Sequence, residues 1–226
     1  CLFYYYRYSV DRDEGLNFTD LLWKVFATGL IATVVSLVFR LGASLLGTTK
    51  LASNILFTDF IYQINLALFI SFLIAAYTSW KRLILYQKSK WLIRTWAVFV
   101  VCLFIVLIYD SLQIAIPEPL TTIILVVIGL LVFILSANMR WVAYLNFKQK
   151  WTCLLLLLLS FFYLGYFIYT VSKLSESINA QSPSFSGFNS HIFNLCLLSF
   201  VIVYSVFSFL VILFNLPTSS VFEQKL

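Results

Sequence analysis

Side chains that could do chemistry are few in this sequence, and they are scattered. There is one histidine, His191, and there are four cysteines, no two of them close together. Without a CxxC pair or a second histidine, the sequence does not indicate a zinc site, a redox pair or a haem held by two histidines. We therefore predict no catalytic residues, no metal site and no bound cofactor, and hence no enzymatic activity in this chain.

Four charged residues lie at the ends of long apolar runs, on the side that the orientation derived below places outside: Arg40, Asp59, Asp110 and Glu118. Together they could form a ligand site, or they could simply pair with one another. Pairing is favoured, because charges are common at the membrane interface. A charge near lipid is costly without a partner. We therefore expect Arg40 to pair with at least one of the three carboxylates.

The segment from Asn215 to Leu226 has the pattern of a helix end followed by a new helix. Pro217 cannot donate a backbone hydrogen bond and disfavours helical geometry in the residue before it. Ser220 and Glu223 have the spacing of a capping box, in which each side chain bonds a backbone N–H at a helix start. We predict a break or a bend near Pro217 and a second helix from Ser220, which together would form a transduction joint.

The composition requires that most of these residues face lipid. The chain is 62% hydrophobic and only 11% charged, with a mean hydropathy of +0.98. Soluble domains are roughly 45–50% apolar and about 25% charged. The net charge of +6 does not indicate nucleic-acid binding, because no basic patch falls on a soluble segment. The predicted fold class is an all-α, polytopic transmembrane helix bundle.

A helix crosses the hydrocarbon with about 20 apolar residues. The sequence predicts six such spans: Leu21–Phe39, Phe60–Trp80, Trp91–Tyr109, Pro119–Met139, Trp151–Ser172 and Ile192–Leu216. The organisation is therefore a cytoplasmic segment over 1–20, a six-helix membrane domain over 21–216 and the start of an exit helix over 217–226. The stretch from Lys173 to Ser190 is rich in Ser and Asn and is predicted to be a surface loop.

Lysine and arginine predict the orientation, because they accumulate in cytoplasmic loops. With both ends inside, three cations lie outside: Arg40, Lys50 and Lys173. Twelve lie inside: Arg7, Arg12, Lys24, Lys81, Arg82, Lys88, Lys90, Arg94, Arg140, Lys148, Lys150 and Lys225. The six tryptophans also fall at the inner interface, where indole rings are enriched. The predicted topology is N-in and C-in.

A six-span apolar block that ends in Leu-Pro-Thr-Ser-Ser-Val-Phe-Glu-Gln-Lys resembles the membrane input region of bacterial sensor proteins. The resemblance is carried by residues 215–226. It implies a helix that leads to a cytoplasmic output domain, such as a histidine kinase or a SpoIIE-type phosphatase. No output motif is present in the sequence. A helix start at Ser220 with little chain after it leads us to expect that the native protein continues beyond Leu226.

The leading hypothesis for function is a membrane sensor or anchor module that couples the bilayer or an external stimulus to a cytoplasmic output domain. The alternatives are a non-catalytic subunit of a larger membrane complex and a transporter, which the scarcity of charge within the spans disfavours. The expected partners are the lipid bilayer and either a second copy of the chain or another membrane protein. The expected location is the bacterial inner membrane.

Overall fold

The fold is taken from a computed structural model. It describes residues 18–46, 55–86, 89–112, 118–137, 139–180, 187–188 and 191–223. Side chains at 46, 55–56, 118 and 217–223 lie outside that description, as do the remaining residues. The predicted cytoplasmic segment over 1–20 therefore falls almost entirely outside the described residues.

The described chain is all α-helical apart from one short 3₁₀ turn. Its elements are α2 (Phe18–Leu46), α3 (Ile55–Leu85), α4 (Lys90–Ser111), α5 (Glu118–Ser136), η1 (Arg140–Tyr144), α6 (Phe147–Asn179) and α7 (Ile192–Glu223). Six helices in these ranges are long and apolar enough to cross a membrane. The six predicted spans each lie within one of these regions, and the chain is a membrane protein with six candidate transmembrane helices.

One boundary differs from the sequence prediction. The stretch from Lys173 was expected to be a loop, but α6 continues to Asn179. Leu174 packs against the core and Ile178 is fully buried, so the apolar face of α6 extends through the Ser-rich segment. This spacing of apolar residues is helical, and it outweighs the loop preference of the serines between them.

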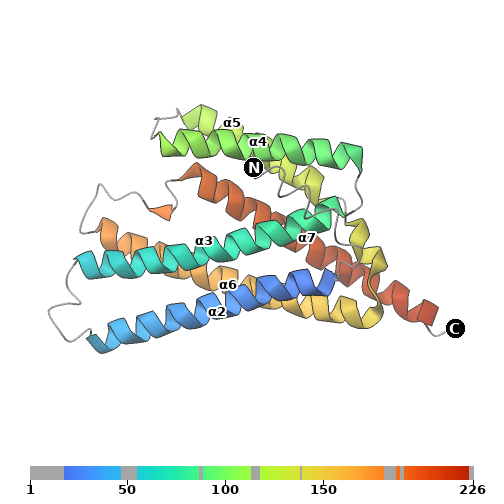
Figure 1. The fold of residues 1–226 in the computed structure, drawn as a ribbon, viewed down its shortest axis with the longest axis horizontal. Coiled ribbons are helices and arrows are strands. Elements are labelled where there is room, and N and C mark those ends of the chain that lie inside the picture. The colour runs from blue at the N-terminus through green and yellow to red at the C-terminus, as the bar shows by residue number, and fades with distance from the viewer. Residues whose placement is uncertain are drawn as a thin grey trace, which may run out of the picture.

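Successive helices run in opposite directions, so the bundle has two ends (Figure 1). One end contains the C-termini of α2, α4 and α6 and the N-termini of α3, α5 and α7; we call it the Arg40 end. The opposite end, where α3 reaches Trp80, is the Trp80 end. Among the described residues, every Lys and Arg except Arg40 and Lys173 lies toward the Trp80 end.

The helices pack as two groups of three (Figure 1). In the first group, α2, α3 and α6 contact one another extensively. In the second, α7 packs against α5 and α4. The two groups meet where α7 lies against α6 and α3. Helix α7 is therefore the element that both groups share.

The α2–α6 contact in the first group depends on one glycine. A Cβ atom added at Gly29 would lie 2.6 Å from Tyr163 Cδ2 and 3.0 Å from Phe72 Cε2. Small residues allow close approach of helices where lipid supplies no hydrophobic driving force for association. Gly42, Gly129 and Gly165 have nothing within 4 Å of such an atom. Close packing at Gly29 therefore leaves no room for a side chain, whereas the other three glycines have room for one.

Aromatic side chains fill the boundary between the two groups. The rings of Trp80 on α3 and Tyr204 on α7 lie 5.3 Å apart, and the ring of Tyr77 on α3 lies 5.4 Å from Trp96 and 5.7 Å from Phe200. Aromatic pairs at such distances add to the energy of the buried area itself. Trp80 and Trp141 are fully buried, so only part of the tryptophan set has the interfacial exposure that the sequence analysis expected.

Helix α7 differs from the prediction at Pro217. The structure assigns one helix over Ile192–Glu223, with Pro217 inside it. The expected break and the separate helix start at Ser220 are therefore absent from this helix, and the alternative of a bend at Pro217 stays a prediction. Proline is tolerated in membrane helices, where it leaves one carbonyl, here that of Leu213, without its usual helical donor. The side chains of Ser220 and Glu223 lie outside the described set, so their capping box stays a prediction.

Candidate functional site

A connected set of polar side chains lies inside the first helix group. The Ser36 hydroxyl on α2 hydrogen-bonds the side-chain oxygen of Asn65 on α3. It also lies 2.8 Å from the hydroxyl of Tyr166 on α6. Asn65 uses its amide nitrogen to donate to the Ile61 carbonyl at 2.8 Å. Ser36 and Asn65 are both fully buried, and the three side chains join α2, α3 and α6 at one level.

This level is within the hydrocarbon and away from the headgroups. Ser36 lies about 15 Å along α2 from Leu46, and Asn65 about the same distance along α3 from Ile55, at 1.5 Å per residue. The helices are longer than the ~30 Å core, so each end extends only part of that distance outside it. Polar groups at this depth are costly unless they bond one another, as these do.

Arg40 lies one helical turn closer to the membrane surface than Ser36. Its Nη1 atom is 3.4 Å from the hydroxyl of Thr170 on α6, a long hydrogen bond. Thr170 follows Tyr166 by one turn and is 2% exposed. The arginine therefore extends the Ser36–Asn65–Tyr166 cluster by a second layer between the same two helices, α2 and α6.

The four charged residues predicted to meet at this end do not form the expected ion pairs among the described side chains. Arg40 contacts Thr170 instead of Asp59 or Asp110. The Asp59 carboxylate accepts a bond of 3.4 Å from Gln63 on its own helix. Glu118 begins α5, but its side chain is outside the description. Arg40 thus forms no described ion pair with Asp59 or Asp110, and its pairing with Glu118 stays a prediction.

Asp110 has a different role from the predicted one. Its Oδ2 atom accepts a hydrogen bond of 2.7 Å from the backbone N–H of Phe193, the second residue of α7. The first N–H groups of a helix have no partner within it, and a carboxylate there is favourable for the helix dipole. Asp110 therefore caps α7 from the end of α4 and fixes where α7 begins.

The α6 start contacts α7 at the Trp80 end. Lys150 is 6% exposed and its Nζ atom donates to the Asn215 carbonyl of α7 at 3.2 Å. The α6 start has its own capping box, in which the Asn146 N–H donates to Gln149 Oε1 at 3.0 Å. Asp110 and Lys150 thus hold α7 near both surfaces of the bundle.

A second set of buried polar atoms makes no hydrogen bond in the described structure: Trp80 Nε1, Ser136 Oγ, Trp141 Nε1 and Tyr204 Oη. They come from α3, α5, η1 and α7 and lie toward the Trp80 end. Two of the four, Ser136 and Tyr204, belong to the second helix group, and a further unpartnered atom, Thr33 Oγ1, lies on α2 in the first group. The Trp141 indole is near the Tyr204 hydroxyl, but outside hydrogen-bonding geometry. Buried polar atoms without a partner are uncommon in folded proteins.

The sequence analysis missed the Ser36–Asn65–Tyr166 cluster. Tyr163, Tyr166 and Tyr169 recur every three residues, a spacing typical of helix packing, and the ring of Tyr163 does pack against that of Phe26 at 5.8 Å. The available signal was Asn65, an amide in the middle of an apolar run. A polar residue in a span is a candidate functional position by default, but its partners on other helices cannot be deduced from spacing.

No family model matches the chain, and no curated protein or solved structure was found that is similar to it. Within the described residues, no group of three or more His, Cys, Asp or Glu side chains could hold a metal ion. The arrangement can therefore be interpreted only through its own geometry. Its main features are the hydrogen-bonded cluster of the first group and an α7 that contacts both groups and is tied to α6 and to α4.

Proposed function

We propose that this chain is a membrane sensor module in which α7 carries a change in the bundle to an output in the cytoplasm. The observation that carries the proposal is the form of α7. At 32 residues it is about 48 Å long, well beyond the ~30 Å hydrocarbon. A helix without a break transmits rotation and translation along its axis to the segment beyond the hydrocarbon.

The contacts of α7 support the same proposal. Asp110 fixes its start, Lys150 holds it near the other surface, and its middle packs against both helix groups. The first group is joined by internal hydrogen bonds, so it can act as the fixed part. A shift of α4 and α5 against this fixed part would move α7 through the Asp110 cap.

The proposed orientation has both ends in the cytoplasm. The gathering of cations and tryptophans toward the Trp80 end supports this side as the inner one. Single cysteines at Lys148 and at Lys173 test it in intact cells, after the four native cysteines have been replaced: Cys1, Cys102, Cys153 and Cys196. A membrane-impermeant thiol reagent should label position 173 and not position 148. Labelling of position 148 and not of position 173 would contradict this orientation and indicate the opposite one.

The direct test of the sensor function is a chimaera. The 226-residue chain is fused to the catalytic region of a histidine kinase, with one to four alanines inserted at the junction. Each added residue rotates the output by about 100°. If the chain is a sensor, the kinase activity of the fusion should vary with the number of inserted alanines. It should return toward its original level near four alanines, because these add about one full helical turn. A ten-residue Gly-Ser junction is the control and should give constant activity, because a flexible linker transmits no rotation.

A matched pair of variants links the chimaera to the bundle. Asp110→Ala removes the α7 cap and should change the activity of the fusion. Asp59→Ala removes a carboxylate that bonds only its own helix among the described residues, and should leave it unchanged. Activity independent of both the insertions and Asp110→Ala would reject the sensor proposal and favour an anchor.

A second candidate is a non-catalytic subunit of a membrane complex. The observation that favours it is the exposure of α4 and α5, which are the least buried of the six candidate spans. Side chains such as Phe104 and Phe133 are more than half exposed. These faces fit either lipid or partner helices. A purified chain that remains a single copy in mild detergent and in bilayers would count against this candidate.

A further inference from the structure

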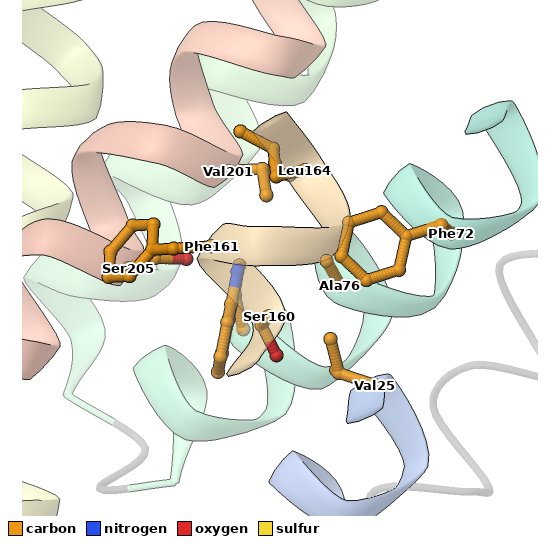
Figure 2. A pocket seen from close by; sticks show the side chains of 9 residues that line it. Val25, Phe72, Ala76, Ser160, Phe161, Leu164, Val201 and Ser205 are labelled. Atoms are coloured by element: carbon orange, nitrogen blue, oxygen red, sulfur yellow. The ribbon is translucent and has the colours of Figure 1, made fainter. Parts of the chain in front are cut away.

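A small cavity lies where the two helix groups meet (Figure 2). Its walls come from α2, α3, α6 and α7 and are mainly apolar. Three side chains with polar atoms also line it: Trp80 from α3, Ser160 from α6 and Ser205 from α7. All three are at least nine-tenths buried. The cavity is thus an apolar space into which three different helices bring hydrogen-bonding groups.

The hydrogen-bonding capacity at this cavity is only partly used. Trp80 Nε1 is a donor only, and it has no partner in the described structure. Ser160 donates its proton to the Leu156 carbonyl at 2.8 Å, which leaves its oxygen free to accept. Ser205 makes no hydrogen bond to another described residue. The residues around this space thus carry one donor without a partner and two hydroxyl oxygens that can accept.

We propose that this cavity binds a single water molecule. The space suffices for about one water and for nothing much larger. The water oxygen would accept the Trp80 N–H, and its two protons would go to the Ser160 and Ser205 oxygens. Three hydrogen bonds is the usual number for a buried water. The site would bridge α3 and α6 of the first group to α7, and it stands independently of the proposed function.

A direct test uses magnetisation transfer from water to the Trp80 indole proton. The intact ¹³C,¹⁵N-labelled chain is placed in a lipid bilayer and studied by solid-state NMR. The Trp80 N–H should receive magnetisation from water, as should the exposed Trp23 and Trp91, which serve as the reference. No transfer to Trp80 while both reference signals respond would overturn the proposal.

A variant with a matched control locates the water. Ser205→Val removes one hydrogen-bonding group and fills the space, so the Trp80 transfer should be lost. Ser199→Val makes the same change at an exposed position of α7 and should not alter it. If Ser205→Val does not fold, Ser205→Ala should still lower the transfer at least twofold. Unchanged transfer in the Ser205 variant would place the water elsewhere and overturn the assignment.

Discussion

The two three-helix groups differ in the hydrogen bonds between their helices. In the α2, α3 and α6 group, the side chains of Ser36, Asn65 and Tyr166 hydrogen-bond across three helices. Both groups also hold buried polar atoms without a partner in the described structure: Thr33 and Trp80 in the first, Ser136 and Tyr204 in the second. The first group is therefore distinguished by one hydrogen-bonded cluster that joins all three of its helices.

This difference matters because lipid is itself apolar. Hydrophobic burial gives helices little reason to associate within a bilayer, so close packing and hydrogen bonds decide which contacts are strong. The first group has both, through Gly29 and the Ser36–Asn65–Tyr166 cluster. The second group has one polar tie of α4 to α7 at Asp110. We therefore expect the first group to be the more rigid, and the second to be the part that moves.

The largest expected effect is from Gly29→Leu. A side chain there collides with Tyr163 and Phe72, so the variant should lose about 3 kcal/mol of unfolding free energy. Steric trapping in a bilayer measures this loss. Gly129→Leu on α5 adds the same side chain where nothing lies within 4 Å. Equal losses of unfolding free energy in the two variants would show that the close contact of α2 with α6 does not contribute specifically to stability.

Asn65→Leu should cost about 2 kcal/mol, because it removes a buried partner of Ser36. Adding Ser36→Ala to it should recover part of the loss, since the stranded hydroxyl is then also gone. The same unfolding assay applies, with Gln63→Leu on an exposed face of the same helix as the control. A double variant as unstable as the sum of its two single variants would argue against a bonded pair.

Asp110→Ala should cost about 1 kcal/mol, as expected for the loss of a helix cap. The effect should be local, with faster hydrogen exchange of the amides at the start of α7. Asp59→Ala is again the control. Exchange that stays unchanged at Phe193 would mean that the α4 carboxylate does not hold α7.

Much of the fold could be predicted from the sequence, because apolar runs of span length depend only on local composition. The predicted start of the sixth span at Ile192 agrees with the start of α7. The break predicted at Pro217 is absent, since a proline ends helices in water more reliably than within a membrane bundle. Asp110 was recognised as important but assigned the wrong partner. Its partner is a backbone N–H on a distant helix, and only the three-dimensional packing of α4 against α7 reveals it.

Two tyrosines give the most direct test of the difference between the groups. Tyr166→Phe removes a hydroxyl that bonds Ser36, and Tyr204→Phe removes a buried hydroxyl that has no partner in the described structure. The chemical change is the same in both, so the unfolding free energies in one bilayer can be compared directly. We predict a loss of about 1 kcal/mol for Tyr166→Phe, and no loss, or a small gain, for Tyr204→Phe. Equal losses, or a larger loss for Tyr204→Phe, would contradict the account.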